Sequence, residues 1–176
     1  MPFTAAKEQF TKLLAEHEAA LRKVVLSYGV THADRDDLSQ EILAQLWASF
    51  GTYDRNRPFS TWMYRVALNT AISHVRATTR RRRRIADSDA PALDTPDHRH
   101  PPSADDERAA LLQRLMAALD ELDRALLLLH LERRTYQEIA DVLGLSVSNV
   151  GTRLNRIRNR LRELAATTKE PIKESR

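Results

Sequence analysis

The 176-residue sequence contains no cysteine, which excludes disulfide bonds and thiolate metal sites and fits a reducing compartment. Only four glycines interrupt a chain rich in Ala, Leu and Arg, and this composition favours helices. No run of about 18 apolar residues occurs, so no membrane insertion is expected. The first residues also lack the apolar core of a signal peptide, and we expect a cytoplasmic protein.

Hydrophobic residues make up 42% of the sequence, which is enough for one large or two small packed domains. The net charge of +4 is distributed unevenly. Residues 51–84 carry nine Lys or Arg against one Asp, and residues 133–176 carry ten Lys or Arg against five Asp or Glu. Acidic residues dominate the intervening stretch 85–132. This pattern predicts two separate contacts with a polyanion.

The segment 135–162 is the most informative, because it predicts two helices joined by a tight turn. Thr135 and Glu138 have the spacing of a capping box at the start of the first helix. Gly144 is the residue type that ends a helix in the left-handed conformation, and Ser146 can cap the helix that follows. These signals together specify a helix-turn-helix.

The second helix of this segment has an apolar side and a polar side at about 100° per residue. The apolar side comprises Val147, Val150, Leu154, Ile157, Leu161 and Leu164. The opposite side is predicted to carry Asn149, Thr152, Arg153, Arg156 and Arg160. In a major groove Arg can bind guanine and Asn can bind adenine, so we expect DNA binding. Arginines that are merely solvated are the alternative, but they would not require the capped helix and the glycine turn.

A linker is predicted at residues 85–105, which hold four of the seven prolines and show no apolar periodicity. His98 and His100 lie in it without a third metal ligand, so no metal site is expected. The fold class is therefore all-α, with two small helical domains joined by a flexible linker. The segments are an N-terminal domain (1–84), the linker (85–105), a C-terminal domain (106–165) and a tail (166–176).

The N-terminal domain is predicted to contain three or four helices. The first has an apolar stripe formed by Phe10, Leu13, Leu14, Leu21, Val24, Val25 and Leu26. The next starts with acidic residues, where the helix dipole favours them, and reaches about Phe50. Its inner face comprises Leu38, Ile42, Leu46 and Phe50, whereas Asp37, Gln40 and Glu41 project from another side.

A further helix is predicted from near Ser60 to about Arg83. Its end coincides with a run of five consecutive arginines, Arg80 to Arg84. One face carries Trp62, Arg65, Asn69, Ser73 and Arg76. With Tyr53, Asn56 and Phe59 from the preceding loop, this face could stack on unpaired bases and hydrogen-bond to them. The open alternatives are that Trp62 and Phe59 belong to the core and that Asn69 is simply solvated.

Three blocks of the sequence together resemble one protein family. The first is Asp36-Asp37-Leu38-Ser39-Gln40-Glu41 followed by Trp47, and the second runs from Phe59 through Trp62 and Arg65 to Asn69. The third is the helix-turn-helix. Their order and spacing resemble the extracytoplasmic-function sigma factors of bacterial RNA polymerase, over nearly the whole chain.

The resemblance implies a non-enzymatic promoter-specificity factor that needs no cofactor and leaves the chemistry to the polymerase. Its partners would be core RNA polymerase, promoter DNA and an anti-sigma factor. The implied polymerase-binding residues are Asp37, Gln40, Glu41, Leu43 and Trp47. Those implied to melt and read the minus-ten element are Tyr53, Asn56, Trp62, Arg65, Asn69 and Arg76. Those implied to read the minus-thirty-five element are Ser148, Asn149, Thr152, Arg153, Asn155, Arg156 and Arg160.

The sequence departs from the family pattern at three points. Ser73 stands where many relatives have an acidic residue, and Gly151 stands where larger polar or basic side chains are common. The segment Asp120-Glu-Leu-Asp123 lacks the proline that often opens the next helix. These departures concern the minus-ten contact, the recognition helix and one helix boundary, respectively.

Two other functions compete with a sigma factor. A helix-turn-helix regulator that acts without polymerase would leave the acidic helix and the Trp62 face unexplained. A nuclease could use Asp36, Asp37 and Glu41 as metal ligands, but Asp36 does not share a helix face with the other two, and no phosphate-binding loop accompanies them.

Overall fold

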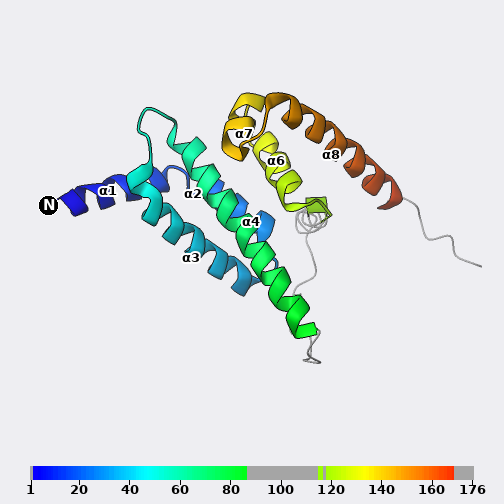
Figure 1. The fold of residues 1–176 in the computed structure, drawn as a ribbon, viewed down its shortest axis with the longest axis horizontal. Helices are drawn as coiled ribbons and strands as arrows, with labels where there is room; N and C mark the ends of the chain where they lie inside the picture. The colour runs from blue at the N-terminus through cyan, green and yellow to red at the C-terminus, as the bar shows by residue number, and fades with distance from the viewer. Residues whose placement is uncertain (1, 87–114, 117, 169–176) are drawn as a thin grey trace, which may run out of the picture. The chain divides into compact units, whose positions relative to one another are not determined.

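The computed structural model describes residues 2–86, 115–116 and 118–168, and every regular element in these ranges is helical (Figure 1). The all-α prediction is thereby confirmed for the described part of the chain. Two compact units, Met1–Pro101 and Pro102–Arg176, are considered separately. Most of the predicted linker (85–105) and tail (166–176) lies outside the described residues, so the domain boundaries remain predictions. None of the described helices combines the length and apolar character needed to cross a bilayer.

The first unit begins with α1 (Pro2–Ala15) and α2 (Glu18–Tyr28), where the sequence predicted a single helix with an apolar stripe. The helix is interrupted at His17, whose Nδ1–H donates to the carbonyl of Leu13 at 2.9 Å. Leu26 was assigned to the apolar stripe, and that assignment is wrong because 43% of the residue is exposed. The reason is geometric, since Leu26 points about 140° away from the buried Leu21 around α2.

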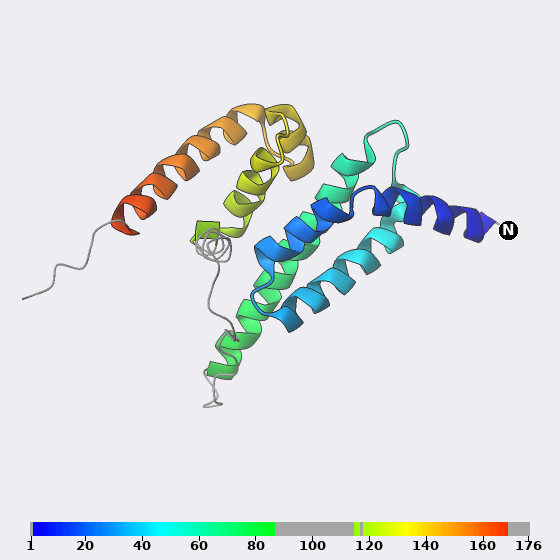
Figure 2. The same cartoon turned by 180° about the vertical axis from the view of Figure 1, so that it is seen from behind.

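The core of this unit lies between α2, α3 (His32–Ser49) and α4 (Phe59–Ala86), which pack against one another (Figures 1 and 2). A short 3₁₀ helix, η1 (Phe50–Thr52), extends α3. The predicted inner face of α3 is confirmed, because Leu38, Ile42, Leu46 and Phe50 are buried. From α4 the buried residues are Phe59, Ser60, Met63, Tyr64, Ala67, Leu68, Thr70 and Ala71.

The start of α3 is fixed by local hydrogen bonds. Thr31 is the N-cap, and its hydroxyl oxygen accepts the backbone N–H of Asp34 at 3.1 Å. Arg35 folds back so that its Nε–H donates to the carbonyl of Gly29 at 3.1 Å. A Cβ on Gly29 would lie 2.5 Å from the Cγ of Arg35, so glycine allows this close return of the chain.

The second unit contains α6 (Glu121–Leu131), α7 (Tyr136–Leu143) and α8 (Val147–Thr168). Asp120 caps α6 by accepting the backbone N–H of Asp123 at 2.7 Å, so the missing proline is replaced by a carboxylate cap. The core of the unit comprises Met116, Leu119, Ala125, Leu126, Leu128, Leu129, Ile139, Ala140, Val142, Val150, Leu154 and Ile157.

The predicted helix-turn-helix and its capping signals are confirmed. Thr135 and Glu138 form a reciprocal capping box at the start of α7. Gly144 ends α7 with φ +67°, and the hydroxyl of Ser146 accepts the N–H of Asn149 at 3.2 Å. Val147 departs from the predicted apolar side, since it is the first residue of α8 and is 40% exposed.

Candidate nucleic-acid and partner interfaces

The outer side of α3 presents the acidic face that the sequence predicted. Asp37, Gln40 and Glu41 are exposed. Gln40 and Asp37 point away from the buried side of the helix, whereas Glu41 lies about 60° from the buried Leu38 and flanks that side. Leu43 is 39% exposed next to them, whereas Trp47 is half-buried. Carboxylates beside an exposed leucine form a mixed polar and apolar surface of the kind found at protein interfaces.

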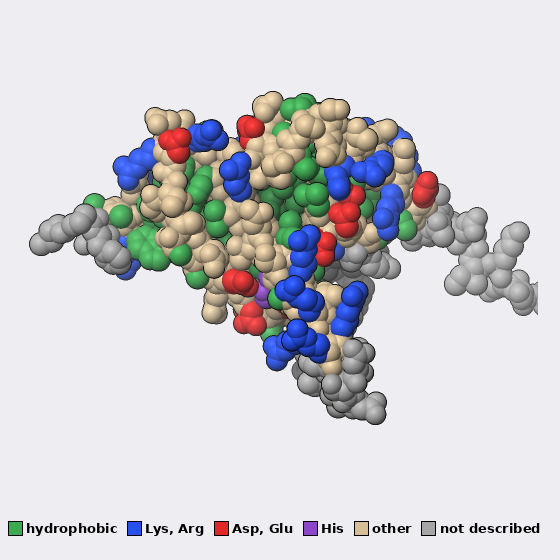
Figure 3. Space-filling view, viewed as in Figure 1, with side chains coloured by type: hydrophobic (Ala, Val, Ile, Leu, Met, Phe, Trp, Pro, Cys, Tyr) green, Lys and Arg blue, Asp and Glu red, His purple; other side chains and the backbone are tan. Residues whose placement is uncertain are grey.

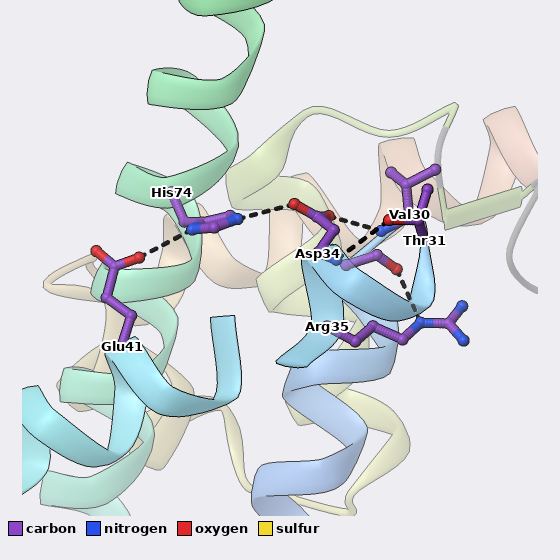
Figure 4. Close-up of polar contacts among 7 residues, drawn as sticks. Val30, Thr31, Asp34, Arg35, Glu41 and His74 are labelled. Atoms are coloured by element: carbon purple, nitrogen blue, oxygen red, sulfur yellow. Dashed lines mark hydrogen bonds and ion pairs between the residues drawn. The ribbon is translucent and has the colours of Figure 1, made fainter. Parts of the chain in front are cut away.

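Glu41 has an intramolecular partner that the sequence did not reveal. His74 of α4 lies between two carboxylates of α3, with Nδ1 2.8 Å from Oε2 of Glu41 and Nε2 2.9 Å from Oδ1 of Asp34 (Figure 4). Asp34 and Glu41 are seven residues apart and therefore share one face of α3. A histidine on the neighbouring helix was the available signal, but periodicity alone does not say which helices meet.

The pKa values of this cluster follow from its contacts. Burial alone would lower the pKa of His74, but the hydrogen bonds and charges of Asp34 and Glu41 outweigh it, and the pKa is raised. For Asp34, burial opposes the hydrogen bond from His74 and the backbone bond from Val30, yet the pKa is lowered. Both shifts favour an ion pair between the imidazolium and the carboxylates.

Aromatic side chains, only 6% of the sequence, are concentrated in the first unit. Phe10 contacts Trp47 and Phe50 with ring centroids 5.2 Å and 5.1 Å apart, and Trp62 contacts Phe50 at 6.1 Å. We define the aromatic cluster as Phe10, Trp47, Phe50, Tyr53, Phe59 and Trp62. Phe59 is buried, in agreement with its core alternative, whereas Trp62 is half-buried and keeps part of its ring accessible.

A hollow of about 240 Å³ opens where the loop before α4 meets this cluster. Tyr53 and Trp62 line it with ring centroids 5.3 Å apart, and the Tyr53 hydroxyl donates to the carbonyl of Arg57 at 2.8 Å. Asn56 instead donates from its amide to Asp54 at 3.0 Å, within the loop. The full lining comprises Thr52, Tyr53, Asp54, Arg57, Thr61, Trp62 and Arg65. An unpaired base could stack on these aromatic rings, and the guanidinium groups of Arg57 and Arg65 lie beside them.

The predicted polar face of α4 continues beyond the hollow. Arg65, Asn69, Ser73 and Arg76 are exposed at spacings of three or four residues, which places them on one side of the helix with Trp62. The side chains of Arg80 to Arg84 are also exposed, and Figure 3 shows Lys and Arg side chains gathered over this end of α4. The arrangement places an aromatic hollow at the start of α4 and a strongly cationic segment at its end.

Most predicted reading residues of α8 are exposed, namely Ser148, Asn149, Thr152, Asn155, Arg156 and Arg160. Arg153 differs, because its guanidinium lies 2.5 Å from the carboxylate of Asp123 on α6, and only 23% of its side chain is exposed. Arg153 lies about 60° around the helix from the buried Val150, so it flanks the apolar side and is not opposite to it. The prediction that it occupies the opposite face is wrong.

Within the described residues no group of three or more His, Asp or Glu side chains could hold a metal ion. Asp36, Asp37 and Glu41 therefore do not form the ligand set that a nuclease would need. His98 and His100 lie outside the described residues.

Two family models match the chain, sigma-70 region 2 over residues 13–81 and sigma-70 region 4 over residues 109–161. RNA polymerase sigma-H factor of Pseudomonas aeruginosa is 29% identical over 164 residues, which cover 86% of this chain and 83% of that protein. RNA polymerase sigma factor CnrH of Cupriavidus metallidurans is 29% identical over 166 residues, with 88% and 85% covered. The ECF RNA polymerase sigma-E factor of Haemophilus influenzae is 27% identical, with 86% and 85% covered.

Solved structures give the same similarity at the level of the fold. CnrH in complex with the cytosolic domain of CnrY has a TM-score of 0.68 and 25% identity, covering 92% of this chain and 90% of that chain. The sigma factor RpoE of Bartonella quintana, in complex with the anti-sigma factor NepR, also has a TM-score of 0.68, with 23% identity and coverages of 90% and 98%.

Proposed function

The chain belongs to the extracytoplasmic-function group of the sigma-70 family of transcription initiation factors, which are not enzymes, and on that basis we propose a division of labour between its two units. The first unit would dock on core RNA polymerase and open the minus-ten element. The second would read the minus-thirty-five element. The observation that carries this proposal is that an exposed acidic face and an aromatic hollow occur in the same chain as a helix-turn-helix.

Docking on polymerase is assigned to the acidic face of α3 with Leu43 and Trp47. The exposure of Asp37, Gln40 and Glu41 supports this assignment, because an interface needs side chains that remain free of the core. A regulator acting without polymerase would have no use for such a face, so the alternative function explains less of the molecule.

Strand opening is assigned to the hollow and the polar face of α4. A base that leaves the duplex loses stacking, and the rings of Tyr53 and Trp62 can restore part of it. Arg65, Asn69 and Arg76 follow on the same face, where they could contact adjacent bases and phosphates. Asn56 is held by Asp54, so we assign it a role in shaping the loop before any contact with a base.

Reading of the minus-thirty-five element is assigned to the exposed side chains of α8. Arg156 is the exposed arginine nearest the start of the helix, and Asn149 lies two turns earlier. A guanidinium fork on guanine and an amide on adenine would supply direct readout. Arg153 is engaged by Asp123, so Arg156 is the stronger candidate for a base contact.

An anti-sigma factor is the proposed regulatory partner. Support comes from CnrH, which was solved with the cytosolic domain of CnrY bound to it.

The decisive experiment combines the full-length protein with purified core polymerase and a library of genomic fragments. Sequencing the fragments from which RNA is made should give two conserved elements at one fixed spacing. A regulator without polymerase function would bind DNA alone and give no polymerase-dependent transcripts. DNA cleavage in the presence of divalent metal ions would instead point to the nuclease.

A further inference from the structure

We propose that His74 is a positioning residue for polymerase docking, which holds Glu41 in one place on the acidic face of α3 while its imidazole carries both protons. This inference rests on the proposed function, because it takes the α3 face as the polymerase contact. His74 itself belongs to α4 and lies outside the set of residues assigned to polymerase or DNA.

The geometry requires two donated protons. Both ring nitrogens lie within hydrogen-bond distance of a carboxylate oxygen, 2.9 Å to Asp34 and 2.8 Å to Glu41 (Figure 4). A carboxylate can only accept, and a neutral imidazole donates through one nitrogen alone. Both bonds therefore exist together only in the imidazolium form, in which His74 joins two points of α3 to α4.

The two carboxylates are not equally dependent on His74. Asp34 is the more buried, with 16% of its side chain exposed, and its other oxygen accepts the backbone N–H of Val30 at 2.8 Å. The side chain of Glu41 is 44% exposed. Arg82 of α4 adds a further positive charge near Asp34, so the charged groups acting on the cluster come from both helices.

Loss of one proton should release Glu41 and leave Asp34 bound. The remaining N–H should stay with Asp34, because leaving a buried carboxylate unpaired costs more free energy than leaving an exposed one unpaired. Glu41 would then sample several rotamers in solvent. Its exposed carboxylate stays accessible to a partner in either state, but only the protonated state presents it in a fixed position.

A fixed side chain binds more tightly because less freedom is lost on association. Ordering one flexible side chain at an interface corresponds to a change of about two- to tenfold in affinity. Because the pKa of His74 is raised in the folded protein, this advantage is complete at acidic pH and disappears as the pH rises through that raised pKa.

The test measures the affinity of the full-length protein for core polymerase between pH 6 and pH 9. His74→Gln keeps one donor nitrogen and cannot become charged, so it represents the neutral state. We expect the native protein to bind about two- to tenfold more tightly than the variant at pH 6, with the ratio approaching one at pH 9. The polymerase's own titrations act on both proteins and cancel in this ratio.

His32 provides a matched control on the same helix. It pairs with Asp36 at 3.0 Å, but its side chain is 91% exposed and it joins no second helix. His32→Gln should leave both the affinity and its pH dependence unchanged. A ratio for His74→Gln that is flat with pH, or that rises with pH, would overturn the role of His74 while leaving polymerase docking intact.

A second measurement requires neither polymerase nor the His74→Gln variant. NMR titration of the native protein should give His74 a pKa above its ordinary value, and Glu41→Gln should lower it. An unchanged pKa in that variant would mean that Glu41 is not held. Absence of polymerase binding at every pH would instead overturn the proposed function, and the docking role of His74 with it.

Discussion

At the scale of single residues, Gly151 lies in the interior of α8, where glycine is the least favourable residue apart from proline. A Cβ at this position would meet only the ring of Tyr136, at an ordinary contact distance of 3.6 Å. Gly151→Ala should therefore stabilise the protein by about 0.5–1 kcal/mol, mainly by restricting the unfolded chain. Urea denaturation measures the change.

Gly144 is the matched control for this prediction. Its φ of +67° is one that alanine adopts only with strain, so Gly144→Ala should destabilise the protein by about 1–2 kcal/mol. If Gly151→Ala also lowers stability, the native backbone of α8 at this point is not an ordinary helix. If it preserves stability but weakens DNA binding, the missing side chain serves a close approach to DNA.

Arg153 and Arg156 are separated by less than one turn of α8, but we expect different effects from their removal. Arg156→Ala should cost about 1–3 kcal/mol in promoter affinity and relax the preference at one or two base pairs. Arg153→Ala should leave the preference unchanged and lower the stability of the second unit, because Asp123 loses its partner.

Binding to a library of variant promoters, together with thermal unfolding, separates these effects. Asp123→Asn is a useful companion, since it breaks the same ion pair from α6 without touching α8. It should reproduce the loss of stability seen with Arg153→Ala. A change of base preference with Arg153→Ala but not with Asp123→Asn would make Arg153 a reader after all.

At the scale of helices, local sequence signals were sufficient to predict where α7 begins and ends and where α8 begins. Thr135, Glu138, Gly144 and Ser146 each act on backbone within four residues, so the sequence alone predicted their roles. The break at His17 was not predictable in this way, because the turn contains neither glycine nor proline. At this turn the imidazole of His17 binds the carbonyl of Leu13, and histidine is not a residue type with a strong preference for turns.

Contacts between helices were the other part that the sequence left open. The faces of α3 and α4 followed from periodicity, but the meeting of Asp34, Glu41 and His74 joins residues 33 and 40 positions apart. The pair between Arg153 and Asp123 spans 30 positions and has the same origin. Periodicity fixes which side of a helix is buried, whereas the partner across the interface depends on how the helices pack.

The cationic end of α4 makes a prediction for the helix as a whole. The side chains of Arg80 to Arg84 are exposed, so we expect contact with phosphates and not with base edges. Neutralising Arg81 and Arg83 to Gln should reduce the slope of log affinity against log salt by about two, at roughly 0.9 for each phosphate contact.

The measurement is promoter binding by the polymerase complex over a range of salt concentrations. Lys7 and Lys12 of α1 are exposed and equally charged, so the double change to Gln at these positions is the control. Its slope should equal that of the native protein. A slope that stays unchanged for the arginine variant would mean that these side chains are only solvated.

At the scale of the whole molecule, we assign polymerase docking to the first unit and reading of the minus-thirty-five element to the second, which predicts that these two contacts can be lost separately. Glu41→Lys should weaken binding to core polymerase about tenfold, the scale of one lost interfacial charge contact. Arg156→Ala should leave polymerase affinity unchanged and weaken only promoter binding. Glu8→Lys, an exposed charge reversal on α1, is the control for net charge.

Both affinities can be measured on the same full-length proteins, first with core polymerase alone and then with the assembled complex on promoter DNA. If the units contribute independently, the double variant Glu41→Lys/Arg156→Ala should show the product of the two losses in transcription at limiting protein concentration. A loss of promoter specificity by Glu41→Lys would mean that α3 also shapes the DNA contact.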